Sequence, residues 1–187
     1  MILDYKDIND LNRYKIMSGT VIPRPIAWIV TQDNGVLNAA PFSYFMPISS
    51  NPALLIVAIG QKDDGSPKDS LANILKTKKA TICFVNKENV DQVQKCAMQL
   101  GKDESEIEKF EIEVKEIMDG FPPMIASSQS ALFCEYYDTY EIPGDTTPVV
   151  LELKYQFIED DRINERNHVN VENIGRAGVT FKALVDL

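Results

Sequence analysis

Small and polar side chains concentrate between residues 36 and 52, where the sequence reads VLNAAPFSYFMPISSNP. Small residues let a ligand approach the backbone closely, and amide and hydroxyl groups can match the donors and acceptors at the edge of a heteroaromatic ring. Its polar groups of this kind are Asn38, Ser43, Ser49, Ser50 and Asn51. The stretch suits a site for a planar ligand, but by composition alone its prolines and serines are more typical of a chain that merely turns.

A second group able to do chemistry is Lys68-Asp69-Ser70, which precedes the apolar pattern SLANILK. The N-terminus of a helix offers free N–H groups and a favourable dipole end, so an ammonium and a hydroxyl beside it can complete a phosphate site. Asp69 would repel a dianion, and we assign it to capping the helix or to orienting Lys68. An ordinary Asp/Ser cap with a surface lysine is the alternative interpretation.

Several other chemistries are disfavoured by the sequence. It has neither G-x-G-x-x-G after a strand nor G-x-x-x-x-G-K-[ST], so a nucleotide-type ligand must be held by other means. Its three cysteines are widely spaced and its one imidazole is His168, in the charged segment ERNHVN. This pattern argues against a disulfide framework and predicts no metal site.

The elements that must position these groups are mostly strands. An Asn-Gly step at Asn34-Gly35, between apolar runs at 24–30 and 36–42, predicts a β-hairpin. Further strands are expected at 53–59, 80–85, 131–140 and 149–158, with the last two paired through Pro143-Gly144, and helices at 70–76 and 89–100. Six or seven strands joined by hairpins, with two or three helices, predict a mainly β, antiparallel barrel.

Residues 102–116 are too acidic to be expected in the core. Phe110, Ile112 and Val114 alternate there with polar residues, as in an edge strand. This pattern predicts an exposed strand at the side of the sheet.

Length and charge set the broad class. A chain of 187 residues favours one domain over residues 1–187. With 19 basic and 28 acidic side chains, its net charge of −9 disfavours nucleic acid as a partner. The longest apolar run, 52–60, is too short to cross a membrane, and the first residues do not resemble a secretion signal. We therefore expect a cytoplasmic protein with no membrane partner.

Five segments in this order resemble the flavin-reductase-like family, whose members are often called flavoredoxins. They are RPIAWIV (24–30), NAAPFSYF (38–45), SSNPALL (49–55), KDSLANI (68–74) and NIGRAGVTF (173–181). The resemblance implies a six-stranded, antiparallel Greek-key split β-barrel that forms a homodimer and binds FMN in a groove at the dimer interface.

The resemblance also implies which residues bind FMN. The flavin ring and ribityl chain would lie against Asn38, Ala39, Ala40, Pro41, Phe42 and Ser43, with further polar contacts from Ser49, Ser50 and Asn51. Lys68 and Ser70 would hold the phosphate beside Asp69, with Arg24 as a candidate second cation and Arg176 closing the site. The sequence departs from the family pattern in having one proline at Pro52-Ala53, serine at position 70 and no Gly-Asn-Tyr ending.

The activity implied by the resemblance is NAD(P)H-dependent flavin reduction, or electron carriage of the flavoredoxin type. The flavin itself accepts hydride in such proteins, so we nominate no catalytic side chain. NADH or NADPH would be the electron donor, and a flavin-dependent monooxygenase or another redox protein would receive the electrons. The alternative is a barrel of the same fold that binds a flavin or another planar ligand without turnover.

Overall fold

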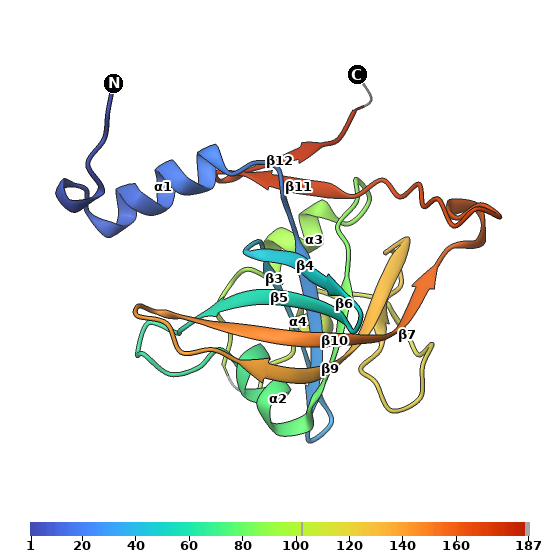
Figure 1. The fold of residues 1–187 in the computed structure, drawn as a ribbon. Helices are drawn as coiled ribbons and strands as arrows, with labels where there is room; N and C mark the ends of the chain where they lie inside the picture. Colours follow the sequence, from blue (N-terminus) through green and yellow to red (C-terminus); the bar gives the residue numbers. More distant parts are fainter. Residues whose placement is uncertain (102, 186–187) are drawn as a thin grey trace.

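The computed structural model describes residues 1–101 and 103–185. Its centre is a seven-stranded antiparallel sheet in the order β3-β2-β6-β9-β10-β5-β4 (Figure 1). Its strands are β2 (Ala27–Asp33), β3 (Val36–Phe42), β4 (Phe45–Ser50), β5 (Ala53–Gly60), β6 (Lys79–Cys83), β9 (Ser130–Thr139) and β10 (Thr146–Ile158). The mainly β class predicted from the sequence is confirmed.

Two small sheets and four helices complete the described chain. The small sheets consist of β1 (Arg24–Pro25), β11 (Ile174–Ala177) and β12 (Thr180–Ala183), and of β7 (Val114–Lys115) with β8 (Met124–Ile125). The helices are α1 (Asp10–Thr20), α2 (Asp69–Thr77), α3 (Val90–Lys95) and α4 (Glu106–Lys109), with 3-10 turns at Tyr5–Asp7 and Asp160–Arg162. None of the helices in these ranges is long and apolar enough to cross a membrane.

The predicted hairpins are present, and the backbone angles at Asn34-Gly35 show why the first one forms. Asn34 and Gly35 both have positive φ, 49° and 85°, and Asp33 pairs with Val36 across them. Such angles match a two-residue turn that suits the twist of paired strands. Strands β9 and β10 also pair antiparallel, as expected.

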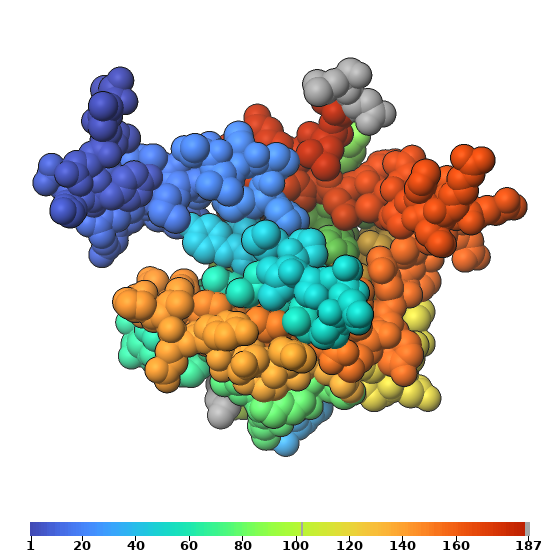
Figure 2. Space-filling view, in the orientation of Figure 1, coloured from blue at the N-terminus to red at the C-terminus, as the bar shows by residue number. Residues whose placement is uncertain are grey.

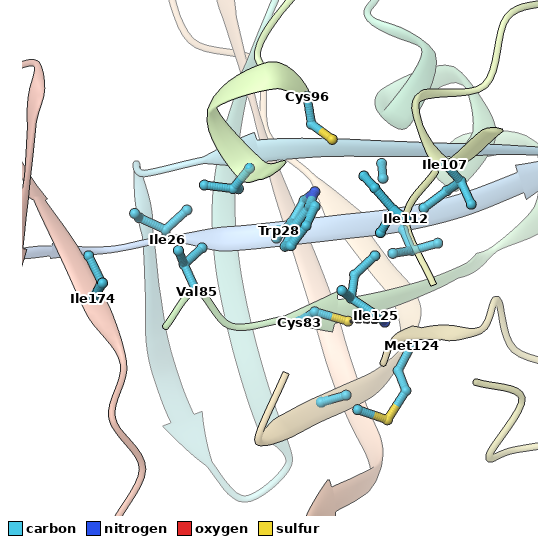
Figure 3. Close-up of a cluster of buried hydrophobic side chains, with 14 of the residues drawn as sticks. Ile26, Trp28, Cys83, Val85, Cys96, Ile107, Ile112, Met124, Ile125 and Ile174 are labelled. Atoms are coloured by element: carbon cyan, nitrogen blue, oxygen red, sulfur yellow. Dashed lines mark hydrogen bonds between the residues drawn. The ribbon is translucent and has the colours of Figure 1, made fainter. Parts of the chain in front are cut away.

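The strand β2 has a hydrophobic cluster on each face. Trp28 and Val30 belong to a cluster with α3, α4 and β8, shown in Figure 3, whereas Ala27 and Ile29 pack with strands β5, β6 and β9 and with helix α2. Because successive side chains of a strand point to opposite faces, a continuous apolar run is buried on both sides. The site described below lies beside β3, the partner of β2 at the edge of the sheet.

The structure corrects several sequence predictions. Residues 102–116 were expected to form an exposed edge strand, but they contain α4, and strand β7 has only two residues. Ile107 and Ile112 are buried in the core there, so the acidic composition was a poor guide. The helix expected over 89–100 ends at Lys95. The sheet has seven strands, within the six or seven predicted from the sequence; the strand absent from the expected ranges is β4, within the polar stretch 36–52.

Candidate functional site

A cavity of about 190 Å³ lies where the end of β3, the start of α2 and helix α4 meet. It brings together Asn38, Lys68 and Ser70, three of the residues predicted from the sequence, and adds Lys62 and Glu106. Asn38 and Ser70 are 32 residues apart in the chain. The antiparallel sheet and the packing of α2 against β2 and β3 bring them into contact.

A buried hydrogen-bond network lies at the wall of this cavity. The Ser70 hydroxyl donates to Asn38 Oδ1 at 2.7 Å, and Asn38 Nδ2 donates to the two carboxylate oxygens of Glu106 at 2.9 and 3.1 Å. The backbone N–H of Ala39 also donates to Glu106, at 3.0 Å. These bonds determine which way the Asn38 amide points, because its oxygen and nitrogen each have a committed partner.

Glu106, like Lys62, is a charged site residue that the sequence interpretation missed. Its side chain is only 4% exposed, although it lies in a segment rich in acidic residues. Burial raises the pKa of Glu106, against the opposing effect of the N–H donors from Ala39 and Asn38, and nearby Asp69 raises this pKa further. The sequence signal available was weak: Ser105 precedes a short helix as its N-cap, which fixes the start of α4.

Lys68 carries the available positive charge of the cavity. Asp69 was expected to cap the helix or to orient Lys68, but its carboxylate pairs with Lys62 at 2.8 Å. In the part of the chain that the structure describes, no carboxylate lies within ion-pair distance of the Lys68 ammonium. An anion entering the cavity would therefore find an ammonium without a competing carboxylate partner.

The first turn of α2 adds backbone donors to the same cavity. Lys68 occupies the N-cap and makes no side-chain capping bond, so Asp69 and Ser70 are the first two helical residues and not the cap predicted for them. The N–H groups of a first helical turn have no partner within the helix. Since Lys68, Asp69 and Ser70 all line the cavity, these donors lie at its wall.

The segment from Pro41 to Ser43 joins three recesses. Pro41 and Phe42 line the cavity at Lys68, a recess of about 160 Å³ beside Arg176, and a groove of about 1000 Å³ bordered by α1. Figure 2 shows the body of the molecule hollowed between the blue α1 and the orange β9–β10 hairpin. A ligand too long for one recess can thus extend from Lys68 along β3.

The remaining predicted residues lie in different surroundings. Ala39 is fully buried, whereas Ala40 lines the cavity at Lys68. Ser49 and Ser50 end strand β4 and Asn51 begins the turn to β5, and none of the three lines any of these recesses.

Arg24 is almost fully buried, with 5% of its surface exposed. Its guanidinium donates to the backbone oxygens of Ser18, Val21 and Gly178, and its Nε lies 3.4 Å from the Ser43 hydroxyl. Arg24 therefore acts as a clamp: its guanidinium joins the end of α1 to the turn between β11 and β12.

The three cysteines are all buried thiols without a disulfide partner. Burial raises the pKa of Cys83, of Cys96 and of Cys134 to about 12 in each case. A thiol with such a pKa is protonated at neutral pH and is a poor nucleophile. Cys96 lines the cavity at Lys68, and it contributes surface there rather than reactivity.

Comparison with known proteins identifies relatives over most of the chain. The family model described as "Flavin reductase like domain" matches residues 17–168. An uncharacterized protein of Aquifex aeolicus is 30% identical over 169 residues, covering 88% of this chain and 86% of that protein.

Solved structures show the same split-barrel fold. Nitrilotriacetate monooxygenase component B from Bacillus cereus superposes with a TM-score of 0.93 at 22% identity, covering 100% of this chain and 96% of that one. Flavoredoxin of Desulfovibrio vulgaris (Miyazaki F) superposes with a TM-score of 0.79 at 12% identity, covering 100% and 95%. At these identities the likeness establishes the fold.

Proposed function

Because this chain belongs to the flavin reductase-like domain family, we propose that it binds FMN and passes electrons from NAD(P)H through it. The observation that carries this proposal is the cavity at Lys68. It combines an ammonium free of carboxylates, an uncapped helix N-terminus and a route along Pro41–Ser43. A phosphate ester joined to a long planar ring system fits that combination.

The phosphate of FMN would occupy the cavity, held by Lys68 and by the N–H groups of the first turn of α2. The Ser70 hydroxyl already donates to Asn38, so it must redirect its proton to bind a phosphate oxygen. The ring would extend over Pro41, Phe42 and Ser43. Ala40, beside them, leaves room for close approach to the backbone.

When bound, FMN supplies the acceptance and release of electrons, and the protein binds and orients it. The Asn38–Glu106 network fixes the cavity wall. The buried residues of β3 would keep water from reaching the flavin through the core of the protein. We assign no proton-transfer role to any side chain. The chain would act as one domain over residues 1–187, as a homodimer in the cytoplasm.

The names of structural neighbours support the choice of partners. One neighbour is a monooxygenase component, another is the flavin reductase PheA2, and a third is an FMN-binding protein from Thermus thermophilus. We infer that reduced flavin is delivered to a monooxygenase or that FMN stays bound as a relay to a redox protein. Tight retention of FMN through purification would favour the relay.

The proposal is tested by titrating the protein with FMN and with riboflavin, which lacks the phosphate. For Lys68→Met we expect FMN affinity to fall about 10- to 100-fold, the scale of a lost charge-assisted hydrogen bond, while riboflavin affinity stays constant. Lys87→Met, which removes an exposed lysine away from the cavity, is the matched control. Equal effects on the two flavins would remove Lys68 from the phosphate site.

Turnover is tested anaerobically on the FMN-loaded protein. Loss of the visible flavin bands on adding NADH or NADPH identifies the donor and supports a reductase. Bands that persist with both nucleotides would instead support a binding protein without NAD(P)H turnover. Failure to bind either flavin would refute the cofactor assignment itself.

A further inference from the structure

The recess beside Arg176 lies next to the proposed flavin site but is not part of the phosphate cavity. It measures about 160 Å³ and shares Pro41, Phe42 and Ala97 with that cavity. We propose that this recess binds a small planar organic anion, an aromatic carboxylate, whose carboxylate is held by Arg176. The inference rests on the proposed function, since it places this anion beside the flavin ring as a substrate or electron acceptor.

The charge of the recess selects an anion. Arg176 is the one charged side chain among the described residues that line it. Within residues 1–101 and 103–185, its guanidinium has no ion pair, and it lies over the Phe181 ring at 4.4 Å from the ring centre. A guanidinium that packs over an aromatic ring can still direct N–H groups to a carboxylate.

Arg24 adds a second positive charge nearby. Its Nε lies 3.4 Å from the hydroxyl of Ser43, which itself lines the recess. The hydrogen-bond partners of Arg24 are neutral carbonyl and hydroxyl groups, so this buried charge is not cancelled by a carboxylate among the described residues. Both charges favour an anion at the same place.

The walls of the recess select a flat, apolar body for that anion. Ile26, Phe42 and Val93 form part of the wall and are between 1% and 8% exposed, so the core holds them in place. An apolar cavity of about 150 Å³ accommodates benzene, so a recess of this size suits one aromatic ring with a small substituent. Tyr14 and Ser43 also line the recess and offer hydroxyl groups for a polar substituent on the ring.

Arg176 is held firmly in position by the fold. Strand β11 pairs with β1, which places Arg176 opposite Arg24. The turn after β11 is fixed because Gly178 N–H donates to Ser18 O at 2.8 Å and Gly178 O accepts from Arg24 at 3.3 Å. The guanidinium is therefore preorganised for binding, which lowers the entropic cost of holding a ligand.

The test measures benzoate and its neutral isostere benzamide binding to the FMN-loaded protein by saturation-transfer NMR. We expect benzoate to bind at least ten-fold more tightly than benzamide, and Arg176→Met to abolish that difference. Arg176→Lys keeps the positive charge and should retain part of the preference for benzoate over benzamide. Lys182→Met removes a cation from the same hairpin outside the recess and should behave as the unmodified protein.

Three results would overturn the proposal: equal binding of benzoate and benzamide, an unchanged benzoate affinity in Arg176→Met, or an effect of Arg176→Met confined to the KM for NADPH. The last result would assign Arg176 to the nucleotide phosphate. Unchanged thermal midpoints for the Arg176 variants exclude misfolding. The same titration without FMN separates the two proposals, because Arg176-dependent benzoate binding by a protein that takes up no flavin would support the recess and refute the flavin site.

Discussion

Replacing Glu106 by Gln tests whether the buried network at the cavity wall stabilises the fold. The carboxylate accepts three N–H contacts, two from Asn38 and one from Ala39, all between 2.9 and 3.1 Å. A Gln oxygen in the position of Oε2 keeps two of them, but the Gln NH₂ then lies about 3.1 Å from Asn38 Nδ2, donor against donor. The new buried NH₂ of Gln then faces a donor where the carboxylate offered an acceptor.

The expected cost at pH 7 is about 1–3 kcal/mol, the range for one buried polar group left without a partner. For a chain of 187 residues this lowers the thermal midpoint by roughly 2–12 °C. Urea unfolding, followed by fluorescence of the single buried Trp28, measures it directly. The control is Glu108→Gln on the same short helix, because Glu108 is exposed. Equal stability of the two variants would refute the role given to the network.

The pH dependence provides an independent check with a defined sign. Burial raises the pKa of Glu106, so the folded protein holds this proton more tightly than the unfolded chain. The contribution of Glu106 to stability is then fully present below the unfolded pKa and is lost as the pH rises through the raised value. Gln does not titrate. We therefore expect the loss of unfolding free energy in Glu106→Gln, relative to the unmodified protein, to grow as the pH falls from 7 toward 4.5. A deficit that shrinks on acidification would contradict this cause.

Two further predictions concern the C-terminal hairpin and the thiols. For Gly175→Ala, the added Cβ would lie 2.9 Å from Pro23 Cβ and 3.0 Å from Arg24 O, so the pairing of β1 with β11 should loosen. The Ile174 N–H, which donates to Val85 O, should then exchange faster with solvent. An unchanged exchange rate at Ile174 would contradict this prediction. The three buried cysteines, with pKa values of about 12, should react with a thiol reagent at pH 8 only after unfolding, and rapid labelling of the native protein would contradict their burial.

Local signals explain what could be predicted from the sequence. The Asn34-Gly35 turn needs only its own two residues and their flanking strands, and the prediction is confirmed. The start of α2 at Asp69 was expected within one residue. Such features depend on neighbours in the chain, which a pattern of residue types can represent.

Long-range contacts explain what could not be predicted. Glu106 contacts Asn38 from 68 residues away, and its acidic neighbours indicated a solvated surface. The resemblance implied Arg24 as a candidate second cation, and the sequence carried no sign that its guanidinium donates to backbone carbonyls as distant as that of Gly178. Strand β4 was missed because an edge strand exposes much of its length and lacks a continuous apolar run.

The clamp made by Arg24 has a consequence for synthesis of the protein on the ribosome. Gly178 follows Arg24 by 154 residues, so at roughly 5–20 residues per second its carbonyl is made roughly 8–30 s after the guanidinium it will bind. Until then the nascent barrel lacks one of the acceptors for Arg24 and the strand that pairs with β1. The recess beside Arg176 is therefore assembled only after β11 and β12 have been made.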